Sequence, residues 1–565
     1  MTDAFEEFRT ICLKPPKHEI DPDTRFDIKP QLVVVEEGNY ELDPAHYVSA
    51  PQLSWDAMLK QTRCRLELIT DPEMYRMLAN SMRGGICMIS GRYSKANNKY
   101  MGNLFDPSKQ SNFIVNLDAN NLYGKAMSYP MPQSGFTWLT DEQWAKIDWL
   151  AQRENQATGY FIECDLEYPP ELHDSHNDYP LAPERVAVTP SVLSEKQVEV
   201  ARQYSKGLPQ KDVKLLPSLL NKVKYVCHYL NLKFYIEHGL KLSKIHRVIQ
   251  FQQARWLQPY IAKNTNLRAA AKSEMEKEFF KLMNNSIYGK TCENQAKHSD
   301  IRLVTDPEEC QKLSNKPQCQ DIRIFNDLLV GLNLKKVKIT INKPFYVGFA
   351  VLELSKLHMF KYVQLILAYS PLPHPPFTWP HPSPAHQPQN PSFTIISLLF
   401  RFHYDVMKKK YGDKIQLLFT DTDSLMYEVC TEDFYQDMWR MREEFDLASY
   451  PKSSPFYDSS NNKVVGKFKD EASGSPITEF VGLKPKMYSY QTLNDPSLGE
   501  AAFTTKKRAK GIQRAAVAKL RHDQYKAQLE HPEEGYVPNR RLGSKLHQIY
   551  GIEVWITLLS NLSSL

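Results

Sequence analysis

The chain has 565 residues, of which 42% are apolar and 24% are charged, and its formal net charge is +6. This length allows several subdomains and a large core, and so mild a positive charge does not by itself indicate nucleic-acid binding. The nine cysteines form no C-x-x-C pair, which argues against a zinc ribbon and for a reducing compartment. No secretory signal and no apolar run near the ~20 residues of a membrane span is present, so we expect an intracellular protein without a membrane partner.

An acidic residue ends the first informative strand. Residues 113–123 read Phe-Ile-Val-Asn-Leu-Asp-Ala-Asn-Asn-Leu-Tyr. The apolar run predicts a buried strand. It delivers Asp118, and Tyr123 follows five positions later.

A helix with an unusual polar stripe is predicted over residues 277–290, as the last part of a longer helix that begins at Leu267. Lys281, Asn285 and Tyr288 stand at i, i+4 and i+7, so they share one face of the helix. A cation, an amide and an aromatic ring make a poor core face. They suit a triphosphate, a base and a sugar.

Residues 415–429 predict two paired strands around a sharp turn that carries Asp421-Thr-Asp423-Ser. Two carboxylates at the tip of a buried hairpin repel each other and lose hydration, unless a cation neutralises them. The alternative is an ordinary Asp-rich turn, because Asp and Ser favour turns.

Taken in order, the three stretches resemble motifs A, B and C of family B DNA polymerases. The Asp-Thr-Asp-Ser and Lys-x3-Asn-Ser-x-Tyr-Gly patterns resemble the protein-primed branch of organellar and viral enzymes, most closely those of Polinton/Maverick-type mobile elements. The resemblance spans about residues 40–360 and 402–550. It implies an α+β, right-hand polymerase fold with palm, fingers and thumb, in which an antiparallel palm sheet carries the catalytic acids.

The resemblance also implies a domain order. Residues 1–46 would be a remnant of an exonuclease domain with an insertion at 15–38, and residues 47–112 an exonuclease–palm linker that binds template. The palm would follow at 113–255, with a TPR1-like insertion, and the fingers at 256–300. Residues 301–490 would return to the palm, and residues 491–565 would form a truncated thumb. Because the segments that would carry the exonuclease acids are missing, we expect no proofreading activity.

Two proline-rich segments interrupt the resemblance. Residues 15–38 hold four prolines and residues 361–401 hold nine, so neither forms one long helix. Residues 361–401 interrupt a helical pattern that should run from 351–360 into 403–412. We interpret them as translated intron or misjoined coding sequence, with a tolerated surface loop as the alternative.

For catalysis, the resemblance implies phosphoryl transfer assisted by two Mg²⁺ ions. Asp118 and Asp423 would hold the metals, with Asp421 as a secondary catalytic acid. The implied dNTP contacts come from motifs A and B and the preceding helix: Tyr123, Asn121, Lys281, Asn285, Tyr288 and Arg268. Tyr123 would exclude a 2′-hydroxyl. Asn121 and Gly124 stand where the family usually has Ser and Pro.

The implied DNA contacts lie outside these acids: Gly84, Gly85, Ser286, Gly289, Lys486 and Tyr488. The two glycines match in position a Tyr-x-Gly-Gly motif, with a plain turn as the alternative. Lys486 and Tyr488 match a Lys-x-Tyr motif and would share one strand face, with an exposed Lys beside a core Tyr as the alternative. The basic run 506–510 resembles part of the thumb or serves as a nuclear-targeting patch.

The expected function is therefore DNA-directed DNA synthesis on a primer–template from dNTPs, by a monomer that works with a terminal-protein primer. If a eukaryotic mobile element carries it, the expected location is the nucleus. The alternative is an inactive relic with residual DNA binding. Tyr123 and Asp-Thr-Asp-Ser argue against RNA synthesis.

Overall fold

The computed structural model describes most of the chain from residue 40 onward. The described residues are 40–189, 213–293, 300–336, 342–360, 402–494, 503–510, 514–530, 536–545 and 548–557, with Glu195, Val198, Arg202 and Ile512. The expected insertion at 15–38, the exonuclease remnant before residue 40 and the segment 361–401 lie outside them.

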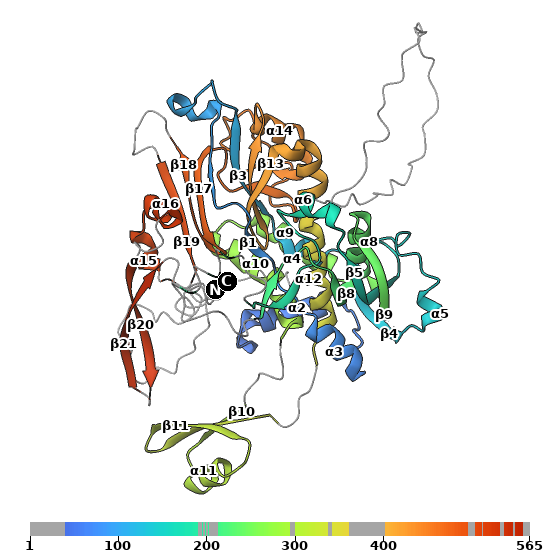
Figure 1. Ribbon diagram of the computed structural model, residues 1–565. Coiled ribbons are helices and arrows are strands. Elements are labelled where there is room, and N and C mark those ends of the chain that lie inside the picture. The colour runs from blue at the N-terminus through green and yellow to red at the C-terminus, as the bar shows by residue number, and fades with distance from the viewer. Residues whose placement is uncertain are drawn as a thin grey trace, which may run out of the picture.

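A mainly antiparallel sheet carries the two acidic segments (Figure 1). Its strands, in spatial order, are β1 (Cys87–Ile89), β13 (Ile415–Asp421), β14 (Ser424–Cys430), β3 (Asn112–Ala119), β17 (Ile477–Lys484), β18 (Met487–Leu493) and β19 (Phe503–Ala509). Three short strands extend it: β2 (Tyr93–Lys95) on β17, β16 (Phe468–Asp470) on β3, and β15 (Phe445–Asp446) parallel to β16. The expected strand at 113–119 and the expected hairpin at 415–429 are thus neighbours.

The stretch 481–490 differs from the single strand that was expected. It crosses the turn between β17 and β18, and Lys486 lies in that turn with φ +62°.

A second antiparallel sheet packs beside the first. Its order is β4 (Met131–Trp138), β9 (Lys241–Ala254), β5 (Thr158–Glu167) and β8 (Lys222–His228). The helices around it are α5 (Asp141–Trp144), η3 (Pro170–Leu172), α6 (His173–His176) and α8 (Tyr229–Glu237), and β6 (Glu184–Ala187) pairs separately with β7 (Val213–Leu216). The TPR1-like insertion expected within 113–255 stays a prediction.

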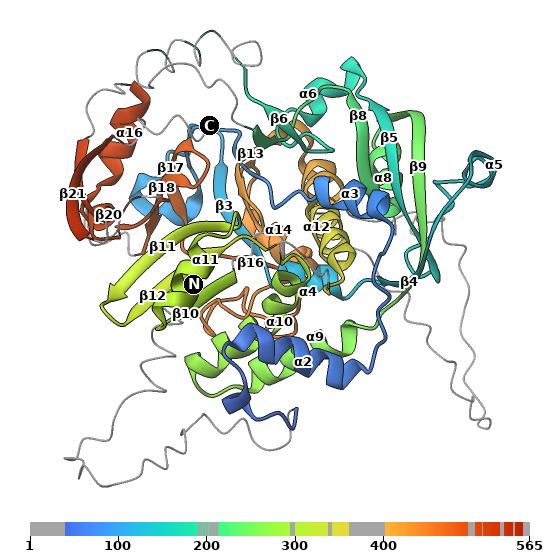
Figure 2. The same ribbon diagram turned by 90° about the horizontal axis from the view of Figure 1, so that it is seen from below.

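Helix α12 (Phe345–Phe360) lies between the two sheets, as Figures 1 and 2 both show. Every residue from Tyr346 to Phe360 is buried, as is typical of a helix that neighbours cover on all sides. It packs against α4 (Leu122–Met127), α8 and α10 (Glu274–Thr291). The chain resumes beyond 401 with η6 (His403–Lys408), α13 (Lys409–Tyr411) and η7 (Gly412–Lys414), which lead directly into β13.

The expected helix from Leu267 into motif B is two helices. Helix α9 (Gln258–Ala270) ends before Ser273, whose side chain caps α10 in a capping box with Glu276. This Ser-x-x-Glu signal marks a helix start in the sequence itself. Helix α2 (Ala50–Thr62) packs on α10, where the Ser54 hydroxyl donates to the Met283 carbonyl at 2.6 Å.

Residues 300–334 form a separate unit and do not continue the palm sheet. Strands β10 (Asp300–Val304), β12 (Leu329–Leu334) and β11 (Cys319–Asn326) make a three-stranded sheet with α11 (Pro307–Ser314) on it. The unit projects from the body of the molecule at the bottom of Figure 1.

The last described segments follow β19. They are α15 (Arg514–Lys519), α16 (His522–Glu530) and the two-stranded ribbon β20 (Tyr536–Lys545) with β21 (Gln548–Thr557). Five further elements complete the described parts of the chain: η1 (Pro44–His46), α3 (Pro72–Asn80), η2 (Lys99–Leu104), α14 (Phe434–Arg440) and η8 (Arg442–Glu444). Within the described ranges, no helix is both long and apolar enough to cross a membrane.

Candidate active site

The structure brings Asp118 and Asp423 to adjoining strand ends. Strand β14 pairs with β3 so that Ser424 lies opposite Asp118, and the Ala119 amide donates a hydrogen bond to the Asp423 carbonyl at 2.7 Å. Asp421 pairs with Ser424 across the hairpin. Sheet pairing therefore gathers the acids of two segments that lie far apart in the sequence.

Both acids have raised proton affinity. Burial, the Asp423 carboxylate and the Glu471 carboxylate raise the pKa of Asp118 from 3.8 to about 7, against the opposing charges of Lys469 and Lys281. Burial also raises the pKa of Asp423, as does the neighbouring Asp421. Two such carboxylates hold a net negative charge that a bound cation would stabilise.

Lys469 and Glu471 belong to this site, although the sequence analysis did not select them. Strand β16 pairs with β3 so that Lys469 lies opposite Asp118. The Lys469 ammonium donates to Glu471 at 2.7 Å, and the Glu471 amide donates to the Asn116 carbonyl at 2.9 Å. Their only signal in the sequence is a cation and an acid two positions apart in a short strand-like stretch, which is common on surfaces.

The acids open into a cavity of about 680 Å³ between the hairpin and strands β18 and β19. Lys506, Lys507 and Arg508 from β19 also line it, and they form part of the basic run seen in the sequence. The remaining lining residues are Asn116, Asp118, Tyr123, Asp421, Thr422, Asp423, Ser424, Glu471, Lys486, Tyr488 and Tyr490. Acidic and basic side chains thus line one space.

The donor set fits Mg²⁺ bound together with a substrate. Within the described part of the chain, no group of three or more His, Cys, Asp and Glu side chains forms a ready-made metal cage. Mg²⁺ is commonly held by one or two carboxylates plus substrate phosphates, without a cage made only of protein. Asp118 and Asp423 supply those two carboxylates, and burial together with neighbouring negative charge raises the pKa of each.

The polar stripe of α10 faces this site. The Lys281 ammonium is close enough to oppose the raised pKa values of both Asp118 and Asp423, although its nearest partner is Glu278 at 3.3 Å. The Tyr288 ring stacks on Tyr123 at 4.5 Å between centroids. The Asn285 Oδ1 atom is buried without a hydrogen-bond partner in the described structure, so it is a free acceptor beside the two stacked rings.

Asn121 has a structural role in this conformation. It adopts φ +47° as the N-cap of α4, and its Oδ1 accepts a hydrogen bond from the Gly124 amide at 3.2 Å. A Cβ atom at position 124 would lie 2.3 Å from the Asn121 amide nitrogen. The two departures from the usual family residues are therefore coupled, and the triphosphate contact predicted for Asn121 stays a prediction.

The remaining motif B and fingers residues lie around the same helices. Arg268 is in the last turn of α9, and its Nε atom is buried without a partner that the described residues provide. Ser286 is buried, and its hydroxyl likewise lacks such a partner. Gly289 is exposed, with open space where a Cβ would stand. Their predicted nucleotide and DNA contacts stay predictions.

Lys486 and Tyr488 both line the cavity. The Lys486 ammonium is ion-paired with the Asp421 carboxylate, so in this conformation it neutralises the secondary acid. The Tyr488 ring stacks on Phe419 of the hairpin at 4.4 Å. Both residues therefore brace the acidic hairpin, and their predicted DNA contacts stay predictions.

The two glycines of the Arg-Gly-Gly segment have different surroundings. A Cβ at position 85 would come within 2.4 Å of the Thr422 side chain, whereas a Cβ at position 84 would meet nothing within 4 Å. Gly85 thus packs against the acidic turn itself, while Gly84 remains open to a ligand.

A sheet that presents paired acids, next to a helix with Lys, Asn and Tyr on one face, is the palm-and-fingers arrangement of a template-directed polymerase. The chain belongs to the family of organellar and viral type B DNA polymerases, whose model matches residues 39–364. The class of enzyme is DNA-directed DNA polymerase. No curated protein matches the chain.

Two solved structures show the fold. The chain is similar to phi29 DNA polymerase complexed with primer-template DNA, with a TM-score of 0.50 and 11% identity over 98% of this chain and 78% of that one. It is also similar to the ternary complex of phi29 DNA polymerase with primer-template DNA and incoming nucleotide substrates, with a TM-score of 0.50 and 12% identity over 99% and 77%. The expected right-hand polymerase fold is thereby confirmed.

Proposed function

We propose that this chain extends a primer 3′-hydroxyl, or the hydroxyl of a protein primer, with dNMP units copied from a DNA template. The observation that carries the proposal is the placement of Asp118 and Asp423 side by side at the ends of paired strands, in a cavity that basic side chains also line. Phosphoryl transfer needs charge neutralisation and positioning more than covalent chemistry, and these residues provide both.

Asp118 and Asp423 would hold two Mg²⁺ ions, which would supply charge neutralisation at the entering and leaving oxygens. In the reaction, a bond forms between the primer 3′-oxygen and the α-phosphorus, and the bond from that phosphorus to the leaving pyrophosphate breaks. Lys281 binds the triphosphate, because its ammonium is close enough to both acids for its positive charge to lower the pKa of each.

The stacked pair Tyr123 and Tyr288 supports the choice of deoxyribonucleotides. The two rings lie 4.5 Å apart and 18° from parallel, and Tyr123 lines the cavity of the acids. A fixed ring beneath the sugar leaves no room for a 2′-hydroxyl. Lys506 and Arg508, which line the same cavity, bind the phosphates of the primer–template.

The test is primer extension with Mg²⁺ and all four dNTPs. We expect Asp118→Asn and Asp423→Asn each to lower the extension rate on the order of 100-fold or more, because each change removes a charge at the reacting centre. Asp433→Asn is the matched control. Asp433 is a palm carboxylate that pairs with Lys99 at 2.8 Å, on a different element from the acidic turn.

Near-normal extension by either active-site variant would overturn the metal assignment. The same reaction without dNTPs checks the absence of proofreading, for which we expect a primer of unchanged length.

A further inference from the structure

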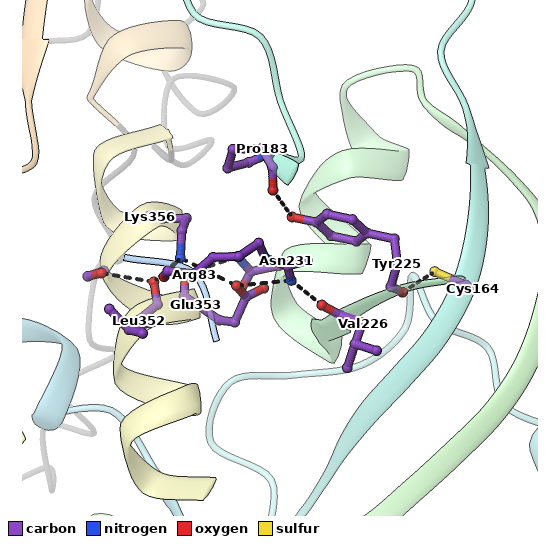
Figure 3. A network of polar contacts seen from close by, with 10 residues as sticks. Arg83, Cys164, Pro183, Tyr225, Val226, Asn231, Leu352, Glu353 and Lys356 are labelled. Carbon is purple, nitrogen blue, oxygen red and sulfur yellow. Dashed lines mark hydrogen bonds and ion pairs between the residues drawn. The ribbon is translucent and has the colours of Figure 1, made fainter. Parts of the chain in front are cut away.

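Helix α12 carries a buried ionic cluster that the proposed reaction does not use. Glu353 and Lys356 are 0% and 3% exposed, and Arg83, from the segment before β1, is 5% exposed (Figure 3). Arg83 donates to the Glu353 carboxylate at 3.3 Å and Lys356 donates to the same oxygen at 3.4 Å. One carboxylate thus forms ion pairs with two cations.

The cluster ties three parts of the molecule together. The Lys356 ammonium donates to the Arg83 carbonyl at 2.8 Å. The Arg83 guanidinium donates to the Val226 carbonyl of β8 and lies 3.9 Å above the Tyr225 ring. Arg83 is therefore held at its backbone by α12 and at its side chain by the second sheet.

Stability alone does not account for this arrangement. Removing charges from water costs several kcal/mol for each ion, and well-packed apolar residues commonly stabilise a core as much as a buried ion pair does. The second Glu353 oxygen and the Arg83 Nε atom are buried without a hydrogen-bond partner in the described parts. The arrangement is more consistent with a need for fixed geometry.

The fixed segment ends at the acidic turn. Three residues beyond Arg83, the Ile86 carbonyl accepts a hydrogen bond from the Thr422 amide at 2.8 Å. Gly85 lies so close to the Thr422 side chain that a Cβ atom there would come within 2.4 Å of it. Cys87 then pairs with Asp421 as β1 begins.

Thr422 is the residue in the turn that needs support. It adopts φ +66°, a left-handed conformation that β-branched residues rarely take. Such strained conformations cost on the order of 1–3 kcal/mol and persist only where the surroundings enforce them. Thr422 separates Asp421 from Asp423, so its backbone angles set the positions of both acids.

We propose that the Arg83–Glu353–Lys356 cluster is a positioning device for the catalytic turn. By fixing residues 83–86 it holds Thr422 in its left-handed conformation, which keeps Asp423 beside Asp118. This inference rests on the proposed function, because it assigns the purpose of that geometry to metal binding. None of the three residues touches the reacting atoms.

The test compares two buried lysines. Lys356→Met removes the ammonium from the cluster, and Lys222→Met is the control. The Lys222 side chain is 0% exposed and pairs with Glu184 at 2.8 Å, but it belongs to the second sheet and does not contact residues 83–86. The readouts are Mn²⁺ binding to the metal-free protein by electron paramagnetic resonance, and hydrogen exchange of a peptide that covers 417–426.

We expect Lys356→Met to weaken Mn²⁺ binding about 10-fold or more, as is usual when a residue that orients metal ligands is lost. We also expect it to speed exchange of the Thr422 amide. Lys222→Met should leave both readouts at wild-type values. In primer extension, Lys356→Met should raise the Mg²⁺ concentration needed for half-maximal rate while leaving the KM for DNA unchanged.

Gly85→Ala tests the same idea without touching a buried charge. The added methyl group would displace Thr422, so this variant should reproduce the weaker Mn²⁺ binding and the faster exchange. If Lys356→Met fails to fold, Glu353→Gln decides the question, because it keeps the size of the side chain and removes the charge that pairs with Arg83 and Lys356; the same weaker Mn²⁺ binding is expected of it.

Failure of this inference is distinguishable from failure of the proposed function. If Asp423→Asn binds Mn²⁺ as the wild type does, the metal assignment is overturned. If Asp423→Asn loses Mn²⁺ binding while Lys356→Met and Gly85→Ala match Lys222→Met, the acids bind metal and the cluster does not position them.

Discussion

At the scale of single residues, the raised pKa of Asp118 has two consequences. In the metal-free protein the folded state holds its proton up to about pH 7, whereas the unfolded state releases it near pH 3.8. Between these values the folded state binds more protons, so its stability falls as the pH rises through that window. Metal must also displace this proton below pH 7.

We therefore expect metal-free Asp118→Asn to be more stable than the wild type at pH 8, by about 1 kcal/mol or more, and the difference to shrink towards pH 5. Thermal unfolding in the presence of a chelator measures this. Mn²⁺ affinity of the wild type should fall about 10-fold per pH unit below pH 7, because one proton competes with the metal.

Asp165→Asn is a control for which we expect the change in stability to have the opposite sign. A hydrogen bond from the Lys224 amide lowers the pKa of Asp165, so its carboxylate stabilises the fold above the unfolded pKa. Its loss should destabilise the protein at pH 8. Equal stability of the wild type and Asp118→Asn at both pH values would show that Asp118 is not under charge repulsion.

The residues that the sequence predicted best are those whose spacing is local. Asp118 lies near the end of an apolar strand, and Asp423 lies in the turn between two apolar strands. Lys281, Asn285 and Tyr288 share one helical face. Each of these local settings follows from sequence pattern, whereas the pairing of β3 with β14 that brings the two acids together does not. Glu471 and Lys469 reach the site only because β16 pairs with β3. That pairing joins segments distant in the sequence, and no local pattern reveals it. The same holds for Gly85, whose partner Thr422 lies in the turn between β13 and β14.

At the scale of elements, the sequence predicted strands and helices better than it predicted their ends. The hairpin at 415–429 and the helix at 351–360 were found because apolar runs mark them. The break between α9 and α10 was missed even though its capping box, Ser273 and Glu276, is a local signal. The unit formed by residues 300–334 was missed because its strands are short and mostly exposed, so burial leaves little pattern in them.

The start of α4 gives a prediction about coupled residues. Gly124→Ala places a methyl group against the Asn121 side chain that caps this helix, and overpacking of this kind costs about 1–3 kcal/mol. Asn121→Ser shortens that side chain and keeps a capping oxygen. We expect the double variant to be more stable than the sum of the single changes predicts, by about 1 kcal/mol.

Hydrogen exchange of a peptide that covers residues 119–128 measures this local opening. Additive effects of the two substitutions would contradict the coupling. Ser128→Ala is a control on the same helix, since its hydroxyl bonds to the Gly124 carbonyl at 2.9 Å and does not contact Asn121. It should behave additively with Asn121→Ser.

At the scale of the whole molecule, the described segments on either side of 361–401 both contact Tyr179. The Tyr179 ring lies 4.7 Å from the Phe360 ring and 5.5 Å from the His403 ring. Phe402, in turn, stacks on Phe468 at 3.9 Å, in the strand that pairs with motif A. Helix α12, the segment leading into the catalytic hairpin and motif A thus form one packed unit.

This closeness allows a direct test of residues 361–401. A linker of about four residues spans roughly 14 Å when extended, so it can join Phe360 to Phe402 without moving either. We expect the shortened chain to keep the same fold and to extend a primer at least as fast as the full chain, because every described contact of Phe360 and Phe402 is retained. Parallel primer-extension and thermal-unfolding measurements on the two proteins check this.

The outcomes separate the three readings of the segment. Activity in the shortened chain alone would identify 361–401 as sequence that the working enzyme does not contain. Equal activity would make it a tolerated loop, as the slow growth of loop-closure entropy with length permits. If both chains fold and bind Mn²⁺ but neither extends a primer, the acids would be remnants of an active ancestral polymerase, and the proposed DNA synthesis would be wrong for this protein.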